Sequence, residues 1–337
     1  MGRSTIPVLI SLFSLLVATG SVVALVSLRG AVSKERSRVK AAAYLEDGAG
    51  AQTPMPVDPA WINYRRTVKF PVDMKTVVAL AVDADDHIYV AGDTCLCRYS
   101  PDGRLESRTM LTFEPTCLAV GGRQHIVPGR VYVGFADHVE VFNPDGTKEA
   151  IWQGIDKARF TSISTGEHDV YIADVGWNVV QHFDTTGKLF SPIGGPGHFA
   201  PAPGSFAAHF DLVVGRDDLV YVVDRRDCRI EGYDANGEIE RHWGQASPGF
   251  DDFAGRNNPA QITLTGDGRF VTAEEDPLRV KVYNRAGERT GVVCGPDDTG
   301  PVADLAADRH NRILVLDSAA RCVRIFEEKQ AAKEKGK

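Results

Sequence analysis

The sequence predicts an all-β fold, a six-bladed β-propeller preceded by one N-terminal transmembrane helix. Six apolar five-residue stretches recur, at 88–92, 131–135, 170–174, 220–224, 270–274 and 313–317. An aromatic residue follows each stretch, and successive aromatics are 43, 41, 50, 50 and 43 residues apart. In five of the six repeats a glycine lies four residues after the aromatic. Short strands and turn residues in a repeat of this length are typical of propeller blades.

The N-terminal segment predicts a membrane anchor. After a short tail (1–5), residues 6–28 carry no charge and are bounded by Arg3 and Arg29. A helix of this length spans a hydrocarbon core of about 30 Å, whereas the apolar region of a cleaved signal peptide is usually about 7–15 residues long. We therefore expect an uncleaved, single-pass anchor that attaches the protein to a membrane.

Residues 29–62 combine a basic juxtamembrane cluster with a linker rich in Ala, Pro and Gly. Taken alone, basic residues after the anchor favour a cytoplasmic location for the chain on that side, but long domains are translocated in spite of such charge. We expect the propeller on the extracytoplasmic side, in the periplasm.

The propeller is expected over 63–329, with four strands in each blade and a charged tail at 330–337. Asp102-Gly103, Asp145-Gly146 and Asn236-Gly237 are the strongest turns between third and fourth strands, because glycine accepts positive φ at little cost. The sixth blade reaches the C-terminus without a fourth strand, which would leave a sheet edge open. Residues 64–72 read as a strand and are predicted to supply it.

Composition narrows the function classes. The net charge is −7 and no basic run occurs among the repeats, which argues against a nucleic-acid partner. The six cysteines include no Cys-x-x-Cys pair, so a zinc site is poorly supported and most of them read as small apolar blade residues. A disulfide between Cys97 and Cys117 is allowed by the spacing but not required.

The repeat resembles the NHL family of six-bladed propellers over residues 64–329. Blade four carries its pattern at Asp224, Arg229, Tyr233 and Gly237. Blade five carries it at Pro259, Arg279, Tyr283 and Gly287, with Glu274 in place of Asp, while blade six keeps Asp317 but has Cys322 where Arg is usual. The resemblance implies a propeller fold. It leaves function open, because such families include scaffolds, ligand binders and a few enzymes.

Acidic residues occupy one equivalent position in blades three to six: Asp174, Asp224, Glu274 and Asp317. They could form an acidic rim for a cation. Asp readily accepts hydrogen bonds from the backbone of its own turn, so a structural role in each hairpin is favoured.

Residues that do not repeat indicate a ligand site at the mouth of the central channel. Asp211, Gln261 and Asp304 lie just ahead of the inner strands of blades four, five and six, and His209 is two residues before Asp211. This set predicts either oxygen ligands for a divalent cation or contacts to a small polar ligand. The alternative is a group of solvated carboxylates without a ligand.

A second set indicates a protein interface. Trp177, Asn178, Arg225 and Arg226 fall on the hairpins between the second and third strands of blades three and four. Exposed Trp beside Arg is favoured at protein interfaces, although a tryptophan packed under its own loop fits equally well.

Taken together, the sequence predicts a membrane-anchored, monomeric, non-catalytic propeller that serves as a protein- or ligand-binding scaffold. No cofactor is expected beyond a divalent cation at the channel mouth. The first alternative is a metal-assisted hydrolase or lyase that uses Asp211, Asp304 and His209. The second is a redox-linked protein whose cysteines matter.

Overall fold

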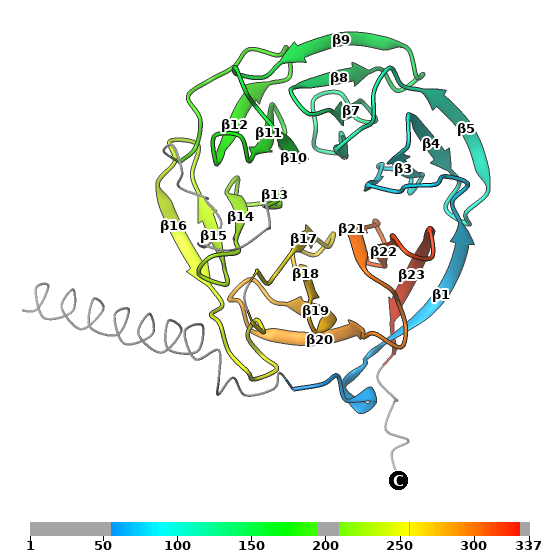
Figure 1. Cartoon of the computed structure of the whole chain (residues 1–337), viewed down its shortest axis with the longest axis vertical. Coiled ribbons are helices and arrows are strands. Elements are labelled where there is room, and N and C mark those ends of the chain that lie inside the picture. The colour runs from blue at the N-terminus through cyan, green and yellow to red at the C-terminus, as the bar shows by residue number, and fades with distance from the viewer. Residues whose placement is uncertain (1–54, 195–208, 256, 331–337) are drawn as a thin grey trace, which may run out of the picture. The chain divides into compact units, whose positions relative to one another are not determined.

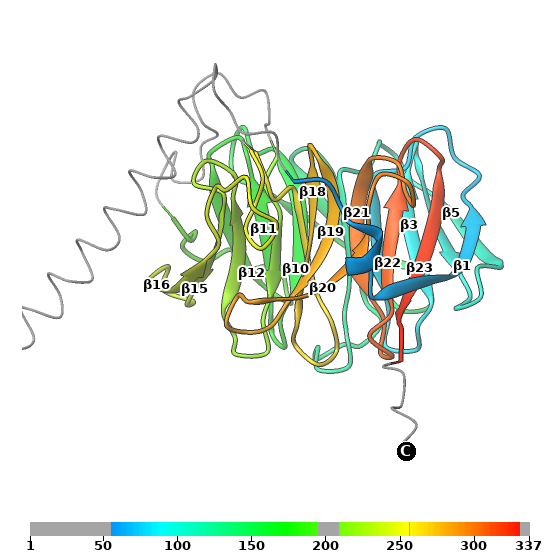
Figure 2. The ribbon, with the colours of Figure 1, turned by 90° about the horizontal axis from the view of Figure 1, so that it is seen from below.

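The computed structural model describes residues 55–194, 209–255 and 257–330, and within them the chain forms six antiparallel sheets arranged as a ring (Figure 1). Each sheet is one blade, and its strands are stacked from the channel outward. Seen from the side, the strands run between the two faces of the ring (Figure 2). The predicted six-bladed all-β propeller is therefore confirmed.

The blades are consecutive along the chain. Blade one comprises β2 (Ala79–Val82), β3 (Ile88–Gly92), β4 (Cys95–Tyr99) and β5 (Leu105–Met110). Blade two comprises β6 (Cys117–Val120), β7 (Val131–Gly134), β8 (His138–Phe142) and β9 (Lys148–Gln153). Blade three comprises β10 (Phe160–Thr165), β11 (Asp169–Asp174) and β12 (Val179–Asp184). Blade four comprises β13 (Leu212–Val214), β14 (Val220–Asp224), β15 (Arg229–Tyr233) and β16 (Ile239–Trp243). Blade five comprises β17 (Gln261–Leu264), β18 (Phe270–Glu275), β19 (Leu278–Tyr283) and β20 (Arg289–Cys294).

Blade six closes the ring as predicted. Its strands are β21 (Val302–Ala307), β22 (Ile313–Asp317), β23 (Cys322–Glu328) and, outermost, β1 (Tyr64–Pro71). β1 pairs antiparallel with β23 from Tyr64 opposite Glu328 to Pro71 opposite Cys322. The N-terminal strand thus covers the sheet edge that the C-terminus leaves open.

Burial depends on position within a blade. The second strands β3, β14 and β22 are buried at every residue, because both faces of the sheet pack against neighbouring blades. The outermost strand β5 is almost wholly exposed. Apolar clusters fill the spaces between blades, for example Leu80 and Val90 of blade one against Leu314 and Leu316 of blade six. The core is therefore a ring of interfaces between blades.

Glycine is required where a turn approaches a side chain closely. Gly103 lies beyond the end of β4 with φ of 89°, and a Cβ at this position would overlap the ring of Phe70 on β1. Phe70 in turn lies 5.0 Å from the ring of Tyr99, between ring centroids. Gly103 therefore leaves room for Phe70 of β1 to pack, in addition to allowing the chain to reverse direction.

Blade three departs from the expected four strands. Among the residues that the structure describes, which stop at 194 after this blade, its sheet contains β10, β11 and β12 only, and a fourth strand is reduced to two isolated bridges, Val180 with Ile193 and Phe183 with Leu189. The bridges are too few and too far apart to form a regular ladder along the edge of β12.

Residues 55–62, within the segment expected to be a linker, pack on blade five. Pro59–Trp61 form a short 3-10 turn, and the Trp61 ring lies 4.6 Å from that of Phe250, between ring centroids. The guanidinium of Arg279, a side chain with no exposed surface, donates a hydrogen bond to the carbonyl of Met55. We call residues 55–63 the N-terminal strap.

No helix in the described part of the chain is long and apolar enough to cross a membrane. The predicted anchor at 6–28 and the tails at 1–5 and 331–337 lie outside the described residues. Membrane attachment therefore stays a prediction.

Candidate functional site

A cavity of about 470 Å³ occupies the centre of the ring. The inner strands of all six blades line it, together with the residues that lead into them. The predicted channel residues His209, Asp211, Gln261 and Asp304 all contribute to its wall. Its volume lies within the range of small-molecule pockets.

Asp211 connects three blades. One carboxylate oxygen accepts hydrogen bonds from the Ser162 hydroxyl of blade three and from its own neighbour, the Leu212 N–H at 2.9 Å. The other oxygen accepts the Ile262 N–H of blade five at 2.7 Å. Burial raises the pKa of Asp211 to about 6, although these donors oppose the shift.

Asp304 repeats this arrangement where the ring closes. Its oxygens accept the Leu305 N–H of its own strand and the Leu80 N–H of blade one, both at 2.7 Å. Burial, and after it the charge of Asp211, raises the pKa of Asp304 well above its usual value. The two carboxylates therefore join neighbouring blades, four to five and six to one.

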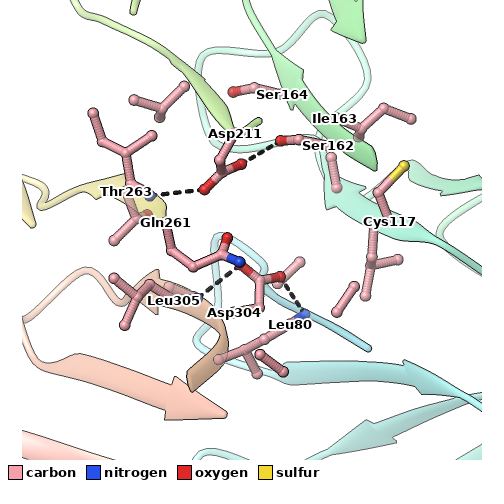
Figure 3. A pocket seen from close by; sticks show the side chains of 18 of the residues that line it. Leu80, Cys117, Ser162, Ile163, Ser164, Asp211, Gln261, Thr263, Asp304 and Leu305 are labelled. Atoms are coloured by element: carbon pink, nitrogen blue, oxygen red, sulfur yellow. Dashed lines mark hydrogen bonds between the residues drawn. The ribbon is translucent and has the colours of Figure 1, made fainter. Parts of the chain in front are cut away.

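Gln261 and His209 lie beside this pair. The Gln261 side chain reaches into the space between Asp211 and Asp304 (Figure 3). Its amide nitrogen is 3.3 Å from Nε2 of His209. Burial, and then the positive charge of Arg225, lowers the pKa of His209 to about 4, so the imidazole is neutral at pH 7.

The expected divalent-cation site is poorly matched by these donors. The oxygens of both Asp211 and Asp304 already accept backbone N–H groups from two strands. Among the described residues, no three His, Cys, Asp or Glu side chains converge in a way that could hold a metal ion. Asp211 is also not the solvated group of the alternative interpretation, since it is only 5% exposed, whereas Asp304 is half-buried.

The predicted interface residues separate into two environments. Trp177 is 39% exposed, and its indole N–H donates to the Asp156 carbonyl at 2.6 Å. Asn178 is half-buried with φ of 55°, which suits its place in the hairpin. Arg226 is exposed. These three residues lie on the hairpins as expected.

Arg225 does not lie on the exposed rim. It is buried and contributes to the cavity wall, where its guanidinium donates to the Asn257 carbonyl and to Glu275 at 2.8 and 3.0 Å. Because Arg225 and Arg226 are adjacent, the hairpin of blade four lies at the mouth of the cavity. The two predicted sets therefore share one end of the ring.

The acidic residues of the hairpins have the structural role that the sequence favours. Asp174 accepts the Gly176 N–H at 2.8 Å, and Asp317 accepts the Ala320 N–H at 2.8 Å. Glu274 instead accepts the Ala254 N–H from the loop before blade five. At three of the four positions, the side chain seven residues after the acidic residue contacts its carboxylate; these side chains are Gln181, Lys281 and Arg324.

Sequence reasoning missed the polar partners inside the ring. The hydroxyls of Ser162 and Ser164 accept the Leu212 and Val214 N–H groups and join blade three to blade four. The sequence does not single out these two residues, because a serine within a strand most often reads as a solvent-exposed residue. All six cysteines are free and buried, so the Cys97–Cys117 disulfide is not formed.

Comparison with known proteins supports the fold. No protein-family model matches the chain, and no curated protein matches its sequence. A catalytically inactive virginiamycin B lyase from Staphylococcus aureus with quinupristin has a TM-score of 0.55 at 12% identity, over 81% of this chain and 98% of that chain. The WD40 β-propeller domain of Doa1 has a TM-score of 0.53 at 14% identity, over 79% and 98% of the two chains.

A third structure, a protein of unknown function from Bacteroides thetaiotaomicron, has a TM-score of 0.59 at 15% identity, over 81% of this chain and 74% of that chain. Similarity at these identities shows the fold alone. The chain is a six-bladed β-propeller, and its resemblance to the NHL family stays a prediction.

Proposed function

We propose that this protein is a membrane-anchored, non-catalytic binding scaffold whose partner docks on the rim around the cavity mouth. The observation that carries the proposal is the exposure of Trp177 and Arg226 on two neighbouring hairpins at that rim. Trp and Arg are the residues that most often dominate binding energy at protein interfaces. The proposed partner is a protein.

The cavity supports this choice over catalysis. A general acid or base must be able to reach a substrate proton, and a nucleophile must be free to attack. Asp211 and Asp304 instead hold the N–H groups of neighbouring inner strands. Removing either carboxylate from that role would leave buried donors unsatisfied.

The test compares paired variants of the full-length protein. A partner that co-purifies with the wild type should be lost when Trp177→Ala and Arg226→Ala are combined, while the circular dichroism spectrum still shows a folded ring. Ile239→Ala on β16, where the residue is 46% exposed, is the control and should retain the partner. If only changes at the turns around Gly103 and Gly146 release it, the partner uses the opposite rim and the proposal is wrong.

A further inference from the structure

A second exposed aromatic residue lies on the same rim, over blade two. Phe113 is 58% exposed in the loop between β5 and β6, and that loop continues into the cavity wall at Thr116 and Cys117. Single exposed apolar residues are common and need no explanation. The surroundings of Phe113 are what distinguish it.

The space beneath Phe113 is already filled. Its ring meets the buried Phe135 and the His138 ring edge-on, at 6.3 and 5.8 Å between ring centroids. His138 stacks on Phe135 at 4.6 Å, and its Nδ1 lies 2.8 Å from a carboxylate oxygen of Asp137. Phe113 therefore rests on a packed aromatic base and presents one face to solvent.

Contacts connect this site with Trp177. The Asp137 carbonyl accepts the Gly154 N–H at 2.9 Å, at the start of the loop that contains Asp156. The Asp156 carbonyl accepts the indole N–H of Trp177. We call the surface from Phe113 to Trp177, including Glu114, Asp137 and Asp156, the aromatic ridge.

Charge is distributed unevenly along the aromatic ridge. Glu114 is exposed, and the Asp137 side chain is 69% exposed. Within the described part of the chain, Glu114 forms no ion pair, and Asp137 pairs only with His138. The exposed basic residues Lys157 and Arg159 border the hairpin of Trp177 at the other end. The Phe113 end is therefore acidic around an aromatic face.

We infer that the Phe113 end of the aromatic ridge binds a lysine or arginine side chain of the protein partner. The methylene stem packs on the Phe113 ring, and the charged group lies between the carboxylates of Glu114 and Asp137. Aromatic faces attract such cations, and long basic side chains place apolar stems on apolar surface. The inference rests on the proposed function and adds the chemistry of the contact.

Site-specific photo-crosslinking tests this on the full-length protein. Benzoylphenylalanine replaces Phe113 in one variant and Ile126 in the other. Ile126 is 55% exposed and lies beyond the opposite end of the inner strand β6 of the same blade. We expect crosslinks at position 113 well above those at 126, to a segment that contains Lys or Arg. No excess at 113, or a segment without a basic residue, overturns the inference.

The affinity of the captured segment, made as a synthetic peptide, is then measured for each variant of the protein. Phe113→Ala should weaken its binding about tenfold. Asp137→Asn with Glu114→Gln should weaken it roughly threefold, with less dependence on salt than the wild type. Glu167→Gln is the matched control, because Glu167 is 65% exposed and pairs with its neighbour His168. It should leave the affinity unchanged.

The two proposals fail in different ways. If the paired change at Trp177 and Arg226 releases the partner but the peptide binds equally to Phe113→Ala and wild type, the scaffold stands and the basic contact is wrong. If neither set of changes affects the partner, both proposals are wrong.

Discussion

Asp211 shows how much a single side chain does inside the ring. Its carboxylate accepts hydrogen bonds from blades three, four and five, yet it is only 5% exposed. The N–H and hydroxyl donors favour the charged form, whereas burial opposes it. The effect of burial is the larger of the two, so the pKa of Asp211 rises to about 6.

This shift makes stability depend on pH with a definite sign. A carboxyl whose folded pKa exceeds its unfolded value contributes stability that is complete below pH about 4 and lost as pH rises through about 6. The difference in unfolding free energy between wild type and Asp211→Asn should therefore fall from pH 4 to pH 7. Urea unfolding at each pH measures it.

Asp317 provides a control of opposite sign. Burial favours its neutral form, but the Ala320 N–H and the Arg324 guanidinium outweigh burial and lower its pKa. The difference between wild type and Asp317→Asn should be constant above pH about 5 and decrease in more acidic solution. The same trend for both variants would show that the effect does not come from the individual carboxyls.

At the scale of elements, the N-terminal strap and β1 attach to different blades. The strap contacts β19 of blade five through Met55 and the loop before that blade through Trp61, whereas β1 completes blade six. Asn63 joins the two, since its side-chain oxygen accepts the Val292 N–H of β20 at 2.8 Å. The start of the described chain therefore bridges two adjacent blades.

Truncation should separate these contributions. Removing residues 1–54 should have little effect on the unfolding free energy of the ring. Removing 1–63 should cost about 1–3 kcal/mol, because the buried Arg279 loses a hydrogen-bond acceptor. Removing 1–75 should cost the most, because it also exposes the edge of β23. Denaturant titration of the three proteins measures the series.

A single substitution in β1 tests the packing of this strand without removing any residues from the chain. Phe70 of β1 is 6% exposed, and Phe70→Ala should cost about 3–5 kcal/mol with the strap intact. Equal stability of the proteins that lack 1–54 and 1–75 would mean that β1 adds nothing to blade six.

At the scale of the whole molecule, all described strands begin at Tyr64 or later. The ring is closed by pairing between β1 and β23, so it needs nothing from the first 40 residues to complete a sheet. Removing residues 1–40 should therefore give a folded, monomeric propeller. Light scattering and the β-sheet signal in circular dichroism check the mass and the fold.

The same deletion bears on the membrane prediction. The intact protein should sediment with membranes, and the protein without residues 1–40 should not. Added protease should degrade the propeller in spheroplasts with intact inner membranes. Full protection there would place the propeller in the cytoplasm and contradict the expected extracytoplasmic location.

The sequence alone determined the number of blades, their order and the strand that closes the ring. These features arise from local patterns, because apolar stretches of fixed length make strands and glycine permits the positive φ of Gly103, Gly146 and Gly237. It also identified the four side chains His209, Asp211, Gln261 and Asp304 that line the cavity. Asp211, Gln261 and Asp304 occupy equivalent positions in the repeat, which places them at one level of the ring, and His209 is two residues before Asp211.

Tertiary structure decided what those side chains do. Whether Asp211 and Asp304 face a ligand or hold backbone N–H groups depends on the distance between blades, which no repeat pattern encodes. Contacts between blades also place Arg225 in the cavity wall and join Trp177 to the loop that follows blade two. Such contacts join residues about 50 positions apart, as Ser162 and Asp211 do, and only the closed ring brings them together.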